Sequence, residues 1–206
     1  MSDPKPKRTS CPLCQRPSTA CICRWVNNVD NATEVVVLQH PLEVNNAKGS
    51  ARLLDLCLQT SQLVEGEQFD PQCLLSLLQA DGKQAILLYP ATTQNEAADL
   101  QFQPPEFVVQ DHALANIRLV IIDATWRKSR KMLYLNPALQ QLPRLNLQNM
   151  PASHYRIRKA HAPDQLSTLE AACYALMQLE QDEEKYLPLL QAFDAFVRQQ
   201  MGFRPV

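Results

Sequence analysis

Short apolar runs alternate with longer amphipathic stretches along the first part of the chain. Three runs have the length and the β-branched or aliphatic composition of strands buried on both faces: EVVVLQ (34–39), QAILLY (84–89) and RLVIID (118–123). Apolar residues recur at three- and four-residue spacing in 50–59 and 71–80, which predicts helices. This alternation is typical of an α/β fold with a parallel sheet and flanking helices.

The same helical spacing continues over residues 167–181 and 184–201, so we expect the chain to end in two helices. A chain of 206 residues can form one medium-sized domain with a small appendage. We therefore assign residues 31–206 to an α/β domain and residues 1–30 to a basic tail followed by a small separate segment.

The termini and the hydropathy also bear on location. The opening MSDPKPKRTS lacks the apolar core of a signal peptide, and no stretch approaches the roughly 18 apolar residues of a membrane helix. We expect a cytoplasmic protein without a membrane partner.

Four of the seven cysteines form a C-x2-C-x6-C-x-C pattern in CPLCQRPSTACIC, namely Cys11, Cys14, Cys21 and Cys23. Four thiolates this close in sequence can converge on one tetrahedral ion, and a closed four-sulfur shell is typical of structural zinc. Disulfides or free thiols are the alternatives, and a reducing cytosol disfavours disulfides. The remaining cysteines lie singly in apolar helical patterns, and we expect them to be small buried hydrophobes: Cys57, Cys73 and Cys173.

Polar or proline-bearing loops follow the three predicted strands. In open parallel sheets the ligand crevice lies outside the carboxyl ends of the strands, so His40, Pro90 and Asp123 are candidates to line one site. The chain has neither a G-x-G-x-x-G motif nor a Walker loop, which argues against a common dinucleotide or triphosphate cradle. Further along, Ser167 and Glu170 have the spacing of a capping box that opens a helix, and such a helix start can also bind anionic groups.

The net charge of −1 conceals an uneven distribution, because residues 118–159 carry nine basic residues and one acidic residue. Blocks of this kind are often solvated faces, but they also match the footprint of a phosphate backbone. The acid is Asp123, and a basic cluster follows it directly: Arg127, Lys128, Arg130 and Lys131. Arg16 and Arg24, beside the cysteines, are expected to extend the same basic face.

Taken in order, these motifs resemble the DTW-domain family, the tRNA-uridine aminocarboxypropyltransferases. The resemblance covers nearly the whole chain and rests on the cysteine pattern, HPLE, YPA, DATW, YRIRKA (155–160) and STLEA. The D-x-T-W motif is present as Asp123, Thr125 and Trp126. One departure is GSARL (49–53), where many members have N-T-x-R-L; Arg52 and Leu53 match, and a role of the asparagine is left open.

The resemblance implies transfer of the 3-amino-3-carboxypropyl group of S-adenosylmethionine to N3 of a tRNA uridine, with release of methylthioadenosine. It also implies a SPOUT-like core with a C-terminal trefoil knot. It places the cofactor on residues of three motifs: Leu88, Tyr89, Pro90, Thr125, Ser167, Thr168 and Glu170. The tRNA is expected to contact the basic cluster together with His40, Arg52, Arg156, Arg158 and Lys159.

The D-x-T-W motif suits this chemistry, and we expect its three residues to be catalytic. Uridine N3–H is mostly protonated at neutral pH, so its attack on the sulfonium-activated carbon benefits from a general base, for which Asp123 is the candidate. Burial beside Trp126 would raise the pKa of Asp123. Alternatively, Asp123 caps the following helix, and Trp126 either stacks on a base or adenine or belongs to the core.

Two other functions share parts of this pattern. A SPOUT-type RNA methyltransferase would have the same cofactor and basic surface but release S-adenosylhomocysteine. A non-catalytic, zinc-containing RNA-binding protein would retain the cations and bind no S-adenosylmethionine.

Overall fold

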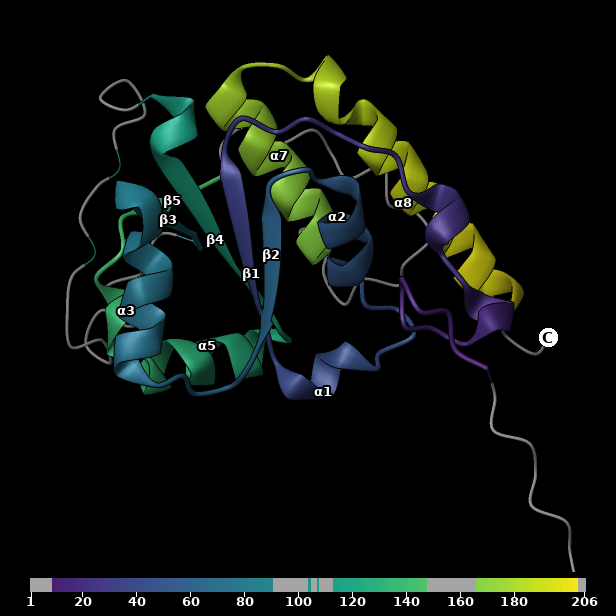
Figure 1. Ribbon diagram of the computed structural model, residues 1–206, viewed down its shortest axis with the longest axis horizontal. Helices are drawn as coiled ribbons and strands as arrows, with labels where there is room; N and C mark the ends of the chain where they lie inside the picture. Colours follow the sequence, from purple (N-terminus) through teal and green to yellow (C-terminus); the bar gives the residue numbers. More distant parts are fainter. Residues whose placement is uncertain (1–8, 91–103, 105–106, 108–112, 148–165, 204–206) are drawn as a thin grey trace, which may run out of the picture.

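A five-stranded, entirely parallel sheet forms the centre of the protein (Figure 1). The computed structural model describes residues 9–90, 104, 107, 113–147 and 166–203. The strands have the order β2-β1-β4-β3-β5 and the bounds Glu34–Gln39 (β1), Ser61–Glu65 (β2), Gln84–Leu88 (β3), Ile117–Asp123 (β4) and Arg144–Leu145 (β5). The predicted α/β fold with a parallel sheet is confirmed.

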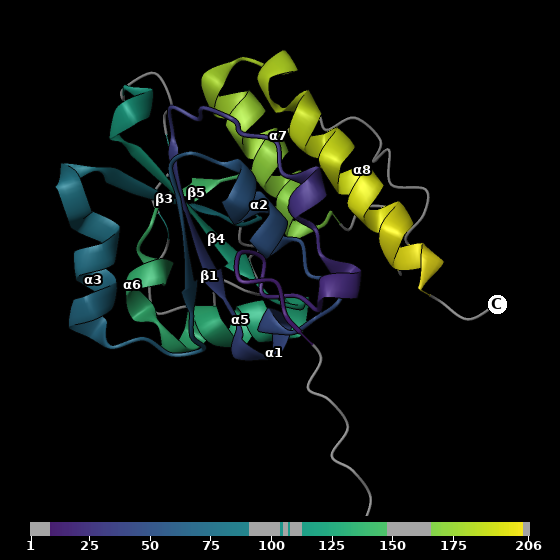
Figure 2. The same cartoon turned by 45° about the vertical axis from the view of Figure 1, so that its right-hand side comes forward.

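Helices cover both faces of the sheet (Figures 1 and 2). One face packs against α2 (Ala51–Cys57), α7 (Thr168–Glu180) and α8 (Leu187–Gly202). The other packs against α3 (Pro71–Gln79), α5 (Trp126–Leu135) and α6 (Pro137–Gln140). The short α1 (Pro41–Val44) follows β1, and the 3-10 turns are η1 (Ser18–Ala20), η2 (Cys23–Trp25), η3 (Ala80–Gly82), η5 (Leu114–Asn116) and η6 (Glu184–Tyr186).

The period-two alternation of strand side chains separates two cores. In β1, Val35 and Val37 belong to the core under α2, α7 and α8, whereas Val36 and Leu38 belong to the core under α3, α5 and α6. All four are fully buried. The unbroken apolar runs of β1, β3 and β4 therefore reflect burial on both faces, as expected for central parallel strands.

The structure adds two strands that the apolar pattern did not predict. β2 lies at an edge of the sheet, and its residues are only partly buried, so its sequence SQLVE carries no apolar run. β5 has two residues, too few for any period to be recognised. One prediction about cysteine was wrong: Cys73 is exposed, because α3 buries Leu74 and Leu78 instead, whereas Cys57 and Cys173 are buried as expected.

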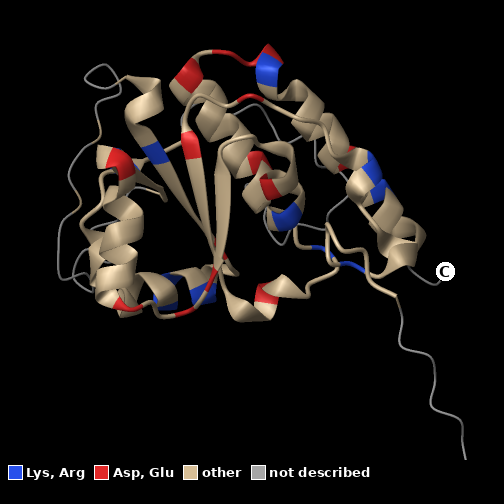
Figure 3. Cartoon of the chain, viewed as in Figure 1, with Lys and Arg blue, Asp and Glu red and all other residues tan. Residues whose placement is uncertain are grey.

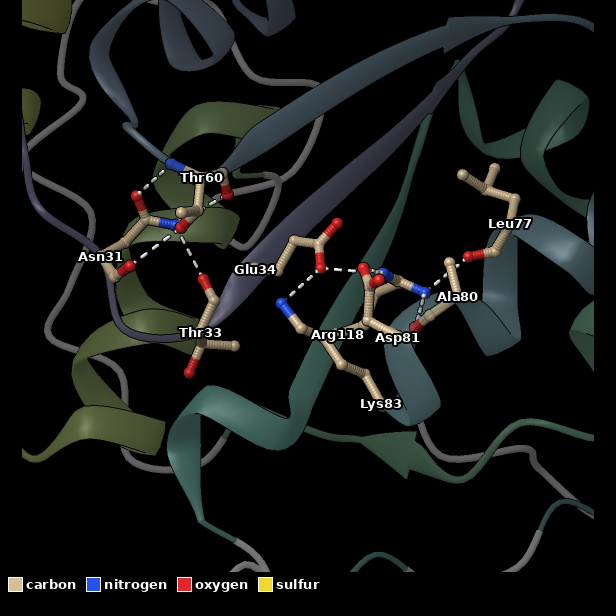
Figure 4. Close-up of polar contacts among 9 residues, drawn as sticks. All are labelled: Asn31, Thr33, Glu34, Thr60, Leu77, Ala80, Asp81, Lys83 and Arg118. Carbon is tan, nitrogen blue, oxygen red and sulfur yellow. Dashed lines mark hydrogen bonds and ion pairs between the residues drawn. The ribbon is translucent and has the colours of Figure 1, made fainter.

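A polar network ties the amino ends of the strands together (Figure 4). Arg118 is almost completely buried in β4, and its Nη1 donates to the carbonyl oxygens of Leu77 at 2.6 Å and Ala80 at 3.0 Å. Its Nη2 donates to Glu34 at 2.9 Å, and Lys83 donates to the same carboxylate oxygen at 2.7 Å. These bonds hold the end of α3 against the amino ends of β1 and β4. They lie at the end of the sheet opposite Asp123.

In the described ranges, none of the helices has both the length and the apolar character needed to cross a bilayer.

Candidate functional site

A cavity of about 770 Å³ lies at the carboxyl ends of the strands. Its walls come from the ends of β3 and β4, the first turns of α5 and α7, the chain between α1 and α2, and residues 145–147. The chain leaves β1 toward one edge of the sheet, to β2, and leaves β4 toward the other edge, to β5. The cavity therefore opens where the direction of the connections reverses, which is where open parallel sheets bind ligands.

Asp123 is the last residue of β4 and lies in the wall of this cavity, with only 7% of its surface exposed. Its Oδ2 accepts a hydrogen bond of 2.8 Å from Gln39 Nε2, and its Oδ1 accepts one of 2.5 Å from Thr168 Oγ1. Gln39 is the register partner of Asp123 on β1, and Thr168 is the first residue of α7. Three separate elements thus fix the carboxylate.

Burial raises the pKa of Asp123, because an ionised carboxylate loses its hydration there. The hydrogen bonds from Thr168 and Gln39 favour the ionised form and oppose this effect, while the nearby negative charge of Glu43 adds to it. A carboxylate with a raised pKa in a cavity is suited to accept a proton.

The alternative role of Asp123 as a helix cap is not what the structure shows. The N-cap of α5 is Thr125, whose side chain makes no capping hydrogen bond. The carboxylate of Asp123 instead accepts from two side chains of other elements.

Trp126 begins α5 and stacks on Tyr89, with ring centroids 5.3 Å apart and an angle of 18° between the planes. Both rings line the cavity, and Trp126 is 49% exposed, so it is not a core residue. The guanidinium of Arg144 lies 4.8 Å from the centre of the Tyr89 ring. The pair presents an aromatic surface to a ligand at the cavity wall.

The predicted capping box is confirmed at the start of α7. Ser167 Oγ accepts from the Glu170 backbone N–H at 3.2 Å, and Glu170 Oε2 accepts from the Ser167 backbone N–H at 2.8 Å. Ser167 and Thr168 line the cavity, as do Leu88, Pro90 and Thr125. Glu170 is buried at the cap and is not part of the cavity wall.

The basic cluster is partly neutralised by the chain itself. Lys128 pairs with Glu43 at 2.8 Å, and Lys131 pairs with Glu67 at 2.9 Å. Figure 3 accordingly shows acidic residues close to the basic residues of α5. Arg127 and Arg130 are exposed on the same helix. Of the other residues expected to bind RNA, Arg156, Arg158 and Lys159 lie outside the described residues.

The side chains of His40 and Arg52 bond to other residues of the protein. His40 is only 5% exposed, its Nδ1 accepts from the Leu42 backbone N–H at 3.1 Å, and its Nε2 lies 3.1 Å from Glu67. Arg52 donates to the carbonyl oxygen of Leu13 at 3.0 Å and pairs with Asp55 at 3.4 Å.

The sulfur atoms of Cys11, Cys14, Cys21 and Cys23 all lie within 4.8 Å of one another. The Cys11–Cys23 and Cys14–Cys21 distances are 3.6 and 3.8 Å, and the sulfurs of a tetrahedral zinc site with 2.3 Å bonds would be about 3.8 Å apart. Backbone hydrogen bonds at Cys14 and Leu13 lower the pKa of Cys11 to about 6, whereas burial raises the pKa of its neighbour Cys23 to about 12, so the case for a metal rests on the geometry. The four residues could therefore hold a metal ion.

Of the two arginines beside the cysteines, Arg16 is partly buried and Arg24 is exposed. Arg16 donates to the backbone carbonyl oxygens of Ala47 and Gly49, each at 2.7 Å. Arg24 lies over the ring of Trp25 at 4.5 Å. The guanidinium of Arg16 is thus bonded to the body of the protein, and the expectation that the two arginines extend a basic face toward RNA stays a prediction.

From the loop after the first strand the sequence placed His40 at the site, but His40 does not line the cavity, and the lining residues of that stretch are Glu43, Asn46, Lys48, Gly49 and Ser50. The available signal was that this stretch, with the short α1, connects onward from the carboxyl end of β1. Sequence reasoning also missed that Gln39 and Thr168 hold Asp123, which depends on strand register and on the docking of α7.

The family of the DTW domain matches residues 8–201 of the chain. A Drosophila melanogaster protein named tRNA-uridine aminocarboxypropyltransferase 2 is 31% identical over 97% of this chain and 78% of its own length. Proteins of the same name from Macaca fascicularis and Mus musculus are 30% and 29% identical, over 94% and 92% of this chain. The match covers 65% and 64% of those two proteins. No solved structure gives a significant match.

Proposed function

The chain belongs to the DTW-domain family, and we propose on this basis that it is a tRNA-uridine aminocarboxypropyltransferase. The observation that carries the proposal is the D-x-T-W motif itself. It places a buried carboxylate, Asp123, and a half-exposed aromatic ring, Trp126, in one cavity at the carboxyl ends of the strands. A carboxylate that can accept a proton and a surface on which a ring can stack are what proton removal from a nucleobase requires.

We propose that the cavity binds S-adenosylmethionine as donor. Its volume of about 770 Å³ falls in the usual range for small-molecule sites of about 300–1,000 Å³. The residues in contact would be Leu88, Tyr89, Pro90, Thr125, Ser167 and Thr168, and Glu170 would act by holding the start of α7. Trp126 and Tyr89 offer their rings to adenine or to the target uracil.

In the proposed reaction, uridine N3 attacks the carbon of the aminocarboxypropyl chain that is bonded to the sulfonium. The N3–C bond forms as the C–S bond breaks, the bond pair leaves with sulfur as methylthioadenosine, and the N3 proton passes to Asp123. The hydrogen bonds from Gln39 and Thr168 hold the ionised carboxylate in position, and its raised pKa brings its basicity closer to that required.

The tRNA would approach along α5, where Arg127 and Arg130 are exposed. Lys128 and Lys131 would contribute only by exchanging Glu43 and Glu67 for phosphates, since both are already paired. Arg156, Arg158 and Lys159 extend this proposal to a part of the chain outside the described residues.

Three further assignments belong to the same proposal. We assign zinc to Cys11, Cys14, Cys21 and Cys23, within a segment 1–30 that precedes the catalytic domain 31–206. We assign the domain to the SPOUT-like folds with a trefoil knot; residues 148–165, between β5 and α7, lie outside the described residues. We place the protein in the cytoplasm, which fits its free thiols.

One experiment separates this function from its alternatives. Purified protein is incubated with tRNA and S-adenosylmethionine, and both the nucleosides and the small-molecule products are identified by mass spectrometry. The proposal predicts aminocarboxypropyluridine and methylthioadenosine, with Asp123→Asn as the control. S-adenosylhomocysteine would instead identify a methyltransferase, and a protein that binds tRNA but not S-adenosylmethionine would be a non-catalytic RNA-binding protein.

A further inference from the structure

The wall of the cavity between α1 and α2 has no regular secondary structure to hold it. Residues 45–50 form turns and extended chain, and most of them are exposed. Asn46, Lys48, Gly49 and Ser50 nevertheless line the cavity. Two local bonds hold part of its backbone, from the Asn46 N–H to the carbonyl oxygen of Glu43 at 3.0 Å and from the Gly49 N–H to that of Asn46 at 2.8 Å, and further support comes from outside the stretch.

Arg16 supplies that support. Its two terminal nitrogens donate to two carbonyl oxygens of the wall, those of Ala47 and Gly49, and both bonds measure 2.7 Å. Hydrogen bonds from a charged donor are among the stronger ones in proteins, and the planar guanidinium holds both acceptors in one geometry. The side chain is partly buried, and this burial lowers the pKa of Arg16.

Arg16 is itself part of the cysteine loop. Its carbonyl oxygen accepts from the backbone N–H of Cys11 at 2.8 Å, so its backbone position depends on the turn that brings the cysteines together. An ion bound by the four sulfurs would fix that turn.

The cysteine segment also packs against α8 (Figures 1 and 2). Trp25 Nε1 donates to Gln199 Oε1 on α8 at 2.6 Å, and Gln199 Nε2 donates back to the carbonyl oxygen of Cys21 at 3.2 Å. The guanidinium of Arg16 lies 4.9 Å from the centre of the Phe196 ring. These contacts hold the segment that carries Arg16 in place against α8.

The wall held by Arg16 continues to the partner of Asp123. Ser50, next to Gly49, accepts through its Oγ a bond of 3.3 Å from the backbone N–H of Leu169 in the first turn of α7. The neighbouring residue, Thr168, donates to Asp123.

We propose that Arg16 is a positioning residue through which the metal-binding segment shapes the donor cavity. The inference rests on the proposed function, because it takes the ligand of this cavity to be S-adenosylmethionine. It gives the cysteine segment a role in donor binding rather than in contact with tRNA.

The test compares Arg16→Gln and Arg16→Lys with Arg24→Gln, a matched control that also neighbours a cysteine ligand but contacts only Trp25 among the described residues. Zinc content, S-adenosylmethionine affinity by calorimetry and tRNA affinity are measured for each. We expect Arg16→Gln to retain zinc and to bind S-adenosylmethionine about tenfold more weakly or worse, with Arg16→Lys intermediate and Arg24→Gln within about twofold of wild type. Unchanged donor affinity in Arg16→Gln, or a selective loss of tRNA affinity, would overturn the proposal.

A second measurement does not depend on the variants or on the reaction. Amide hydrogen exchange of the wild-type protein is followed before and after removal of the metal with a chelator under reducing conditions. Exchange should rise in residues 45–50 and stay unchanged in α3, on the other face of the sheet. Unchanged protection of 45–50 would contradict the inference even if Arg16→Gln folds poorly. Wild-type protein that fails to bind S-adenosylmethionine would contradict the proposed function, whereas the exchange result would still decide the role of the segment.

Discussion

Gln39 and Asp123 are register partners on adjacent strands, and the side-chain amide of one donates to the carboxylate of the other at 2.8 Å. They are 84 residues apart in sequence, so only the pairing of β1 with β4 brings them together. Because the ladder between β1 and β4 fixes both residues, the carboxylate is held by two paired strands. Such placement favours catalysis that depends on orientation.

The role of Asp123 as a base can be tested with Asp123→Asn, which keeps the size of the side chain but cannot accept the proton. We expect product formation to fall by about 10²- to 10⁴-fold, with partial recovery at higher pH as uridine N3 ionises unaided. Rates are measured with tRNA and S-adenosylmethionine at saturation across a pH series. Zinc content and donor affinity should stay at wild-type levels; an active variant with an unchanged pH profile would remove Asp123 from the chemistry.

The same variant should be more stable than the wild type at pH 7, although it is less active. The folded-state pKa of Asp123 is raised from its ordinary value of 3.8 by burial, so the folded state disfavours the ionised form. The stability associated with protonated Asp123 is complete below pH 3.8 and is lost as the pH rises through the raised value. Asp123→Asn should therefore have the higher Tm at pH 7, and the difference should shrink as the pH falls toward 4. Thermal unfolding at both pH values measures this; a lower Tm at pH 7 would contradict it.

The sequence predicted the parts of the site that follow from strand ends and motifs. Asp123 and Pro90 could be placed because each follows a buried apolar run, and Ser167 could be placed because capping has a local signature. The role of Gln39 could not be inferred, since a glutamine at a strand end carries no signal until the register of β1 and β4 is known. The two-residue β5 could not be predicted either. Its pairing with β3 depends on tertiary contacts and leaves no periodic pattern in the sequence.

The charged side chains show a second limit of sequence reasoning. A run of cations indicates a positive region, but it does not show which acids fold back onto it. Lys128 and Lys131 find Glu43 and Glu67 more than 60 residues earlier in the chain. Arg16 was likewise expected to extend a basic face, and its guanidinium donates to the carbonyl oxygens of Ala47 and Gly49.

The cysteine cluster should contain one zinc ion per chain in protein purified under reducing conditions without chelator. Cys14→Ser removes a buried ligand and should abolish zinc binding and lower Tm, because a small segment with little core depends on its metal. Cys73→Ser is the matched control, since this thiol is exposed on α3 outside the cluster. Metal analysis and thermal unfolding measure both effects; wild-type protein without zinc would falsify the assignment.

Contact with tRNA along α5 is tested best at Arg127, which is exposed and has no ion-pair partner in the described part of the chain. Arg127→Glu should weaken tRNA binding and reduce the salt dependence of the affinity by about one phosphate contact, with donor affinity unchanged. The control is Arg198→Glu, which makes the same charge change at an exposed position on α8. Equal losses in the two variants would indicate a general charge effect and exclude a specific contact at α5.

The network at the amino ends of the strands should matter for stability and not for ligand binding. Arg118→Leu leaves Glu34 with only Lys83 and two carbonyl oxygens without their donor, which should lower the free energy of unfolding by about 3–5 kcal/mol. Lys83→Met removes a more exposed partner and should cost about 1 kcal/mol or less. Urea denaturation measures both, and S-adenosylmethionine affinity should be unchanged in each; reduced affinity would mean that strain spreads along β4 to the cavity.

The order of the strands also determines when the site can exist during synthesis. β1 is made early, but its central neighbour β4 emerges from the ribosome only after β2, α3 and β3, and Thr168 follows later still. Until β4 emerges, the backbone of β1 is paired with β2 along one edge only, and until α7 is made Asp123 lacks its second donor, Thr168. A nascent chain halted before α7 would therefore expose sheet surface to chaperones and would hold its carboxylate through Gln39 alone.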